Sequence, residues 1–160
     1  MMGVILQVSI SPGGVPNHPI ARGEVTCAGI VGDGWRHPNF HGIPKRAILL
    51  ITSEGLDEIK TMGFPVYPGA LGENFTTQGV DRRVLRIGRL LRCGSATIQL
   101  TEPRFPCEAI SVYGKGIQEA IYDQRVMRHD PTSDRWGLSG FYAAVIEPGK
   151  VAAGDPVFLK

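Results

Sequence analysis

Apolar side chains alternate with polar ones, or run together for a few positions, along most of the chain. Between residues 4 and 10 they fall on every second position, which is the pattern of a strand with one buried face. Residues 46–52 form a continuous apolar run, which is typical of a strand buried on both faces. The same criteria predict further strands at 89–93, 96–100, 140–147 and 156–159.

Two segments repeat their apolar residues at helical spacing instead. Ser53 is predicted to cap a helix that carries Leu56 and Met62 on one face and ends at Gly63. A second helix is predicted over residues 116–125. Both helices are short, so the strands dominate the predicted fold.

Turn residues separate the predicted elements. The 21 glycines and 12 prolines are spread along the chain, as expected for turns between many short strands. The sequence shows no internal repeat and no linker. A chain of 160 residues favours one domain. We therefore predict a β-rich fold, a single-domain β-barrel over residues 1–160 with two small helices.

Composition and charge exclude several classes of protein. A hydrophobic content of 42% and a charged content of 20% argue against disorder. The net charge is only +2, and the arginines between residues 82 and 92 have no interleaved aromatics, so we expect a solvated strand face and no nucleic-acid partner. Residues 1–14 lack the basic region and apolar length of a signal or a span, so we expect a cytoplasmic protein without a membrane partner.

The three cysteines do not form a recognisable metal or disulfide framework. Cys27, Cys93 and Cys107 are far apart and include no C-x-x-C pair, which argues against a structural zinc site and a thioredoxin-type motif. Cys27 and Cys93 are predicted to be small buried side chains.

Cys107 has a different sequence environment, at the end of PRFPC and directly after a predicted strand. Pro103 and Pro106 fix their own backbone angles and disfavour helix in the residues before them, which predicts a stiff, non-helical turn. Such a turn presents a reactive thiol or simply closes a sheet edge, and the pattern is compatible with both. Arg104 would favour the thiolate, which attacks electrophiles and binds soft metals.

A loop dense in glycine, proline, histidine and cations precedes the buried strand. Guanidinium groups on such a loop suit a phosphorylated ligand, because they form bidentate, charge-assisted bonds to phosphate. A solvated loop is the alternative, and metal binding by its histidines lacks a carboxylate at ligand-like spacing. The loop is GDGWRHPNFHGIPKRAI, residues 32–48, with Asp33, Arg36, His37, His41, Lys45 and Arg46.

Two other polar segments have more than one interpretation. Residues 67–81 contain glycines that allow close backbone approach and offer Asn74, Thr76 and Thr77 to a polar ligand, or else form a plain hairpin turn. Residues 125–140 are polar, and we predict a mobile loop that is a lid or a partner surface.

Five motifs follow one another along the chain: SPGGVP (11–16), GDGWRHPNFHGIPKRAI (32–48), PGALGENFTT (68–77), PRFPC (103–107) and GFYAAVIEPGKVAAGD (140–155). Together they resemble the MOSC family, the domain named from the carboxy-terminal part of molybdenum cofactor sulfurases. The resemblance implies a MOSC-type β-barrel, a molybdenum–pterin cofactor and, in the branch with the mitochondrial amidoxime-reducing component, reduction of N-hydroxylated small molecules.

The resemblance also assigns roles to individual residues. Cys107, which closes PRFPC, is the expected molybdenum ligand and catalytic residue. Thiolate is a soft donor suited to such a metal, and the two prolines would fix its angle. The resemblance assigns pterin and phosphate binding to Arg36, His41, Lys45, Arg46 and Arg104, and neutral polar contacts to Asn74, Thr76 and Thr77.

Departures from the family pattern leave other hypotheses open. Asn17 stands where relatives with SPGGVP commonly have lysine, and Ile43 stands where a glycine is often seen. One alternative is a non-catalytic carrier of sulfur or of the molybdenum cofactor. Another is a cofactor-free thiol enzyme that uses Cys107 with His41 or His129 as base. With no G-x-G-x-x-G signature between strand and helix, electrons for a reductase would come from a partner protein.

Overall fold

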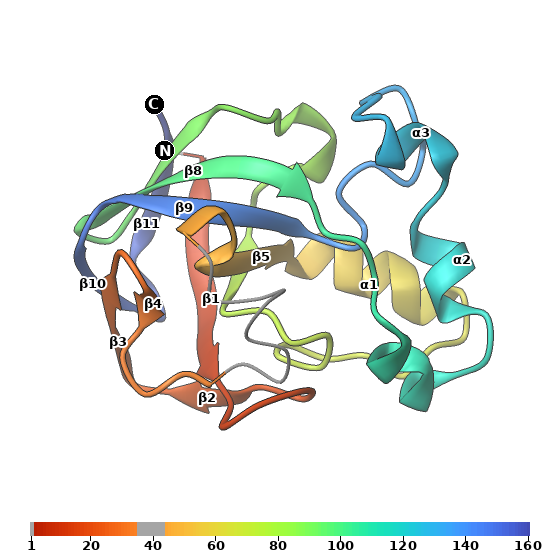
Figure 1. Cartoon of the computed structure of the whole chain (residues 1–160), viewed down its shortest axis with the longest axis horizontal. Coiled ribbons are helices and arrows are strands. Elements are labelled where there is room, and N and C mark those ends of the chain that lie inside the picture. Colours follow the sequence, from red (N-terminus) through yellow and green to blue (C-terminus); the bar gives the residue numbers. More distant parts are fainter. Residues whose placement is uncertain (1, 35–43) are drawn as a thin grey trace.

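The computed structural model describes residues 2–34 and 44–160 (Figure 1). The strands are β1 (Gly3–Ile10), β2 (His18–Ile20), β3 (Arg22–Thr26), β4 (Gly29–Ile30), β5 (Ile48–Thr52), β6 (Phe75–Gln78), β7 (Leu90–Cys93), β8 (Ala96–Pro103), β9 (Phe141–Glu147), β10 (Gly149–Ala152) and β11 (Pro156–Leu159). The α-helices are α1 (Ser53–Thr61), α2 (Ile117–Ile121) and α3 (Gln124–Met127), and the 3-10 helices are η1 (Pro44–Arg46), η2 (Arg82–Val84) and η3 (Glu108–Tyr113).

Seven strands in the described ranges close into a barrel. Their order is β11, β7, β8, β9, β5, β6 and β1, and β1 completes the circle by pairing with β11. Figure 1 shows the two chain ends side by side at this closure and the three α-helices gathered at the opposite side. A small second sheet, with the order β10, β3 and β4, lies against the barrel. The predicted β-rich barrel is therefore confirmed.

One pair of neighbouring strands, β5 and β6, runs parallel, with Leu50 opposite Phe75. Parallel neighbours need a crossover connection, because the chain must return to the same end of the sheet before it can pair again. Here α1 and the loop after it make that crossover. The loop at residues 69–74 is consequently delivered to the edge of the sheet just before β6 begins.

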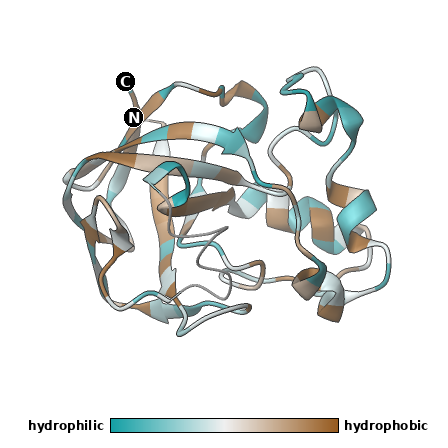
Figure 2. Cartoon of the chain, viewed as in Figure 1, coloured by the Kyte–Doolittle hydropathy of each residue, from teal (hydrophilic) through white to brown (hydrophobic). Residues whose placement is uncertain are grey.

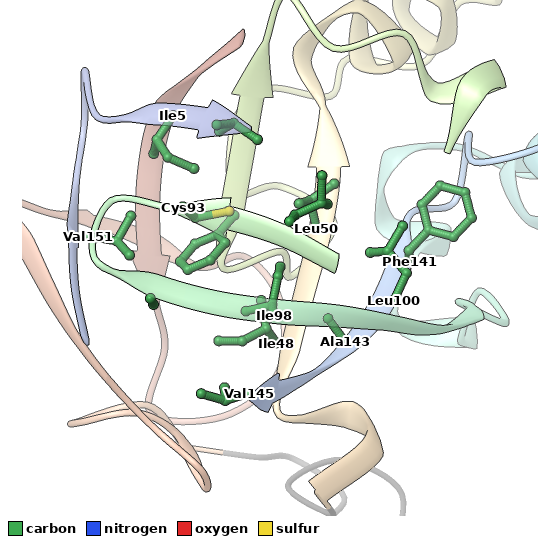
Figure 3. Packing of buried hydrophobic residues seen from close by; sticks show 14 of the residues in the cluster. Ile5, Ile48, Leu50, Cys93, Ile98, Leu100, Phe141, Ala143, Val145 and Val151 are labelled. Carbon is green, nitrogen blue, oxygen red and sulfur yellow. The ribbon is translucent and has the colours of Figure 1, made fainter. Parts of the chain in front are cut away.

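The barrel interior is filled by aliphatic side chains from strands on all sides. Figure 3 shows Ile5, Leu50, Ile98 and Val151 packed together with Cys93 in this interior. All of β5 is buried, because one face points into the barrel and the other lies under the helices. Figure 2 shows β5 apolar along its length, which confirms the prediction from its continuous apolar run.

The first predicted helix forms, with a different cap. The Thr52 side chain, not that of Ser53, accepts the Gly55 N–H at 3.0 Å, because Thr52 is the last extended residue before the helix. Leu56 is buried as predicted, whereas Met62 is 46% exposed. The helix ends before Met62, so the expected apolar face does not extend that far.

The second predicted helix is two helices. α2 ends at Ile121, and α3 begins after Asp123, whose carboxylate accepts the Val126 N–H at 2.9 Å. An aspartate that binds the backbone three residues later caps a new helix and interrupts the previous one. No described helix is both long and apolar enough to cross a bilayer.

The segment at residues 125–140, which was predicted to be a mobile loop, is packed against the barrel through Trp136. Trp136 is 1% exposed, and its indole N–H donates to the Leu85 carbonyl at 2.8 Å. Arg82 donates to the carbonyls of Trp136 and Asp134 and pairs with Glu58. Arg82 is therefore buried, and the predicted solvated face applies only to Arg83, Arg86, Arg89 and Arg92.

The two cysteines predicted to be structural differ from each other. Cys93 is buried in the barrel, and burial raises the pKa of its thiol to about 12. Cys27 is exposed, so that prediction was wrong. It lies in the tight turn between β3 and β4, where no layer of the fold covers it.

Removing the Arg82 side chain tests how firmly the 125–140 segment is held. Arg82→Ala leaves Glu58 and the carbonyls of Trp136 and Asp134, of which that of Trp136 is buried, without their donor. We therefore expect a loss of about 2–3 kcal/mol in the free energy of unfolding, measured by urea denaturation. Arg83→Ala, at the exposed neighbouring position, is the control and should change little. Equal stability of Arg82→Ala and wild type would contradict this account.

Candidate functional site

A cavity opens at the edge of the barrel where four parts of the chain meet. They are the loop after β1, the segment from η1 into β5, the loop at residues 69–74 and the turn that follows β8, and the segment after β4 and strand β9 add to the wall. We call it the Cys107 cavity, and its walls include Cys107, Arg104, Arg46, Asn74, Asp33 and Tyr142. Arg36 and His41, two predicted site residues, lie outside the described residues.

The turn that carries Cys107 is non-helical, as predicted. β8 ends at Pro103, and Cys107 has an extended backbone (φ −77°, ψ 164°) immediately before η3. The Arg104 N–H donates to the Gly140 carbonyl at 2.8 Å, which fastens the turn to the start of β9. The proline-rich sequence therefore holds a partly buried thiol at a defined place in the cavity wall.

Arg104 brings a buried positive charge to the same cavity. Its side chain donates to the carbonyls of Leu71 at 2.8 Å and Ser139 at 3.5 Å. No carboxylate in the described part of the chain lies within ion-pair distance of it. A buried guanidinium with neutral partners favours an anion nearby, whether a thiolate or a ligand phosphate.

Glu73 is a buried acid that sequence reasoning did not single out. It is fully buried, and its carboxylate accepts the Leu71 N–H at 3.2 Å and the Thr76 hydroxyl at 3.1 Å. Burial raises its pKa, while its hydrogen bonds and the charge of Arg104 act in the opposite direction. The sequence feature that could have pointed to Glu73 is its place in GENFTT, between a glycine loop and a strand.

Asn74 lines the cavity and also joins three parts of its wall. Its carbonyl oxygen accepts the Leu49 N–H at 3.0 Å, and its amide donates to the Ser9 carbonyl and to Asp33, at 3.2 and 2.9 Å. Asp33 also accepts the Ser11 N–H at 3.0 Å. Burial raises the pKa of Asp33, against the effect of these hydrogen bonds. The amide therefore fixes the wall in addition to facing the cavity.

The other predicted residues are distributed unequally. Arg46 lines the cavity, pairs with Glu102 and lies 5.4 Å from the centre of the Tyr142 ring. The neighbouring Lys45 is exposed and is not part of the wall. The structure thus brings together Cys107, Arg104, Arg46 and Asn74 from the predicted set.

The two threonines of GENFTT lie in β6, away from the cavity wall. Both are fully buried. The Thr76 hydroxyl is bound to Glu73, and the Thr77 hydroxyl has no partner among the described residues. Their neutral polar groups are therefore used or enclosed within the fold.

The structure also locates Asn17, which departs from the family pattern, and His129, one of the two proposed bases. Asn17 lines the Cys107 cavity, and its side-chain amide donates to the Glu73 carbonyl at 3.3 Å. Ile43 is outside the described residues. His129 lines a neighbouring cavity, and the described wall around Cys107 contains no histidine.

The chain resembles known proteins over most of its length. A sequence profile of the MOSC domain matches residues 37–158. The chain is 28% identical to the uncharacterized protein YflK of Bacillus subtilis over 124 residues, which are 77% of this chain and 52% of that protein. It is 30% identical to the protein YiiM of Escherichia coli over 139 residues, 84% of this chain and 58% of YiiM. The chain therefore spans little more than half the length of these relatives.

Solved structures share the barrel. YiiM from Geobacillus stearothermophilus matches with a TM-score of 0.71 at 23% identity, over 98% of this chain and 74% of that one. The YUAD protein from Bacillus subtilis matches with a TM-score of 0.72 at 24% identity, over 98% of this chain and 94% of that one. These likenesses show a common fold. Together with the profile match, they establish that the chain belongs to the MOSC domain family.

Proposed function

We propose that this chain binds a molybdenum cofactor through Cys107 and reduces N-hydroxylated compounds with electrons from a partner protein. The observation that carries the proposal is that Cys107 and Arg104, from one stiff turn, line one cavity together with Arg46. A thiol beside two guanidinium groups suits a soft metal within an anionic cofactor. Association with this cofactor is a general property of the MOSC domain family.

The donor groups of the cavity fit such a cofactor. Among the described residues, no cluster of three or more histidine, cysteine or acidic side chains is arranged to hold a metal ion. A metal bound here through one thiolate must therefore bring other ligands with it, as a metal with sulfur ligands from a pterin does. Gly14, Gly34 and Gly72 line the wall without side chains, which leaves backbone accessible to a large ligand.

Different side chains of the cavity would bind different parts of the cofactor. When bound, the cofactor supplies two-electron chemistry, which converts an N–OH group and two protons into an N–H group and water. Cys107 Sγ would be the protein's metal ligand, since thiolate is a soft donor. Arg46 and Arg104 would bind the phosphate, since guanidinium is suited to bidentate contacts with it. Asn74 and Asp33 would keep the opposite wall in place.

Replacing the thiol tests the metal ligand directly. In protein made in a host that synthesises the cofactor, we expect near-stoichiometric molybdenum in the wild type and at least a roughly tenfold loss in Cys107→Ala, measured by elemental analysis with pterin fluorescence. Cys27→Ala, which removes an exposed thiol that does not line the cavity, is the control and should retain the metal. Full molybdenum content in Cys107→Ala, or neither metal nor pterin in folded wild type, would refute the proposal.

Replacing Arg104 tests the buried charge. Loss of charge-assisted hydrogen bonds in Arg104→Gln should weaken cofactor retention about 10–100-fold, measured as pterin remaining after dialysis. Arg104→Lys keeps the charge and should retain an intermediate amount, while Arg89→Gln, on the solvated face, should match the wild type. Thermal melts establish that each variant is folded. Unchanged retention in a folded Arg104→Gln protein would remove Arg104 from the binding site.

A further inference from the structure

Arg46 lies at the boundary between two cavities. It belongs to the wall of the Cys107 cavity and to that of a neighbouring cavity, which also includes Glu102, Tyr122 and His129. We call the second one the side cavity. The proposed function uses Arg46 to bind the phosphate of the cofactor, which requires its guanidinium group to point into the Cys107 cavity. The direction of this long side chain is therefore part of the site.

Glu102 fixes one edge of the Arg46 guanidinium group. Its carboxylate accepts a hydrogen bond from Nε of Arg46, the donor nearest to the aliphatic stem. Glu102 is on β8, whereas Arg46 ends η1, so this contact joins two separate elements of the fold. Guanidinium is a rigid, planar fork, and a bond at Nε therefore restricts the direction in which its other nitrogen atoms point.

Tyr142 fixes the plane of the same group. Its ring centre lies 5.4 Å from Cζ of Arg46, which is within the range of a cation–π contact. Tyr142 is buried, so its ring is a fixed surface. It is opposite Glu102 in the antiparallel pair of β8 and β9, and residues directly opposite each other project to the same face of a sheet. Adjacent strands thus supply an edge contact and a face contact to one guanidinium group.

A contribution to stability explains little of this ion pair. The side chains of Arg46 and Glu102 are 22% and 29% exposed, and ion pairs with access to water add little to the free energy of unfolding. The negative charge of Glu102 also opposes the binding of an anion nearby. The benefit that remains is orientation, because a long side chain that is ordered before binding loses less entropy when it binds.

We propose that Glu102 and Tyr142 are positioning residues, which hold the Arg46 guanidinium group toward the anionic group bound in the Cys107 cavity. Both act through Arg46. This inference rests on the proposed function and adds two residues that sequence reasoning did not single out. Because orientation outweighs charge in this account, removal of the Glu102 carboxylate should weaken anion binding, whereas electrostatics alone predicts that it should strengthen it.

Binding of a simple anion to the protein without cofactor tests this role. The probe is inorganic pyrophosphate, titrated calorimetrically at low ionic strength. Arg46→Gln should raise its Kd at least about tenfold, because charge-assisted hydrogen bonds are lost. Glu102→Gln should raise it about three- to tenfold, which is the effect of ordering one long side chain on binding. Glu147→Gln, which removes the carboxylate of an exposed ion pair with Lys160, is the control and should bind as the wild type does.

A double-mutant cycle shows whether Glu102 acts through Arg46. In the Arg46→Gln background, Glu102→Gln should not raise the Kd further, because no guanidinium group is left to orient. Tyr142→Leu removes the ring and should weaken binding at least about threefold, whereas Tyr142→Phe keeps the ring and should stay within about twofold of the wild type. Thermal melts should show little change for Glu102→Gln, as expected for a partly exposed ion pair.

Protein made in a host that synthesises the cofactor distinguishes this inference from the proposed function. Glu102→Gln should retain about three- to tenfold less pterin than Glu147→Gln after dialysis. Pyrophosphate binding that depends on Glu102, in a wild type that holds neither molybdenum nor pterin, supports the positioning role and refutes the proposed function.

Several results would overturn the positioning role. Glu102→Gln would do so if it bound pyrophosphate as tightly as the wild type or more tightly, if it weakened binding equally in the Arg46→Gln background, or if it melted well below the wild type. No binding by the wild type at millimolar pyrophosphate, or equal weakening by Glu147→Gln, would have the same consequence. A Tyr142→Phe protein that binds as weakly as Tyr142→Leu would remove the ring contact from the account.

Discussion

A buried carboxylate, Glu73, is the constraint on which the candidate site depends. It has no access to water, which raises its pKa, so its oxygen atoms must find hydrogen-bond donors inside the fold, namely the Leu71 N–H and the Thr76 hydroxyl, while the charge of Arg104 acts to lower the pKa. In meeting them, the loop at residues 69–74 takes a shape that turns the Leu71 carbonyl toward Arg104. The glycine loop, β6 and the turn after β8 are thereby tied to one another around the Cys107 cavity.

The second determinant is the alternation of side chains after β8. A short extended segment between a strand and a 3-10 helix directs Arg104 to one space and Phe105 to the other. The thiol thus has a cationic, polar side and an apolar, aromatic side within a few residues. The segment at residues 125–140 completes the second side, since Arg82 and the buried Trp136 hold it against the barrel.

Family membership and function have different support in this chain. The profile match and the shared barrel establish the MOSC fold, but the relatives are nearly twice as long as the matched region. The functional proposals therefore use only groups that this chain itself contributes to its cavities. The same groups bear on the rival hypotheses. A thiol enzyme with His129 as base is disfavoured because His129 and Cys107 line different cavities, whereas a cofactor carrier would use the Cys107 cavity without turnover.

Local patterns were sufficient for the strands, the barrel class and the stiff turn at Cys107, because periodicity and proline act over a few residues. They also singled out Arg46, Asn74 and Arg104, which the fold brings to the wall of one cavity. Local patterns did not reveal that Thr76 is turned toward Glu73, that Cys27 is exposed, or that Trp136 is buried. Those outcomes depend on strand register and on contacts between distant segments. Only the closed barrel, in which every strand has a defined inner face, decides which side chains meet.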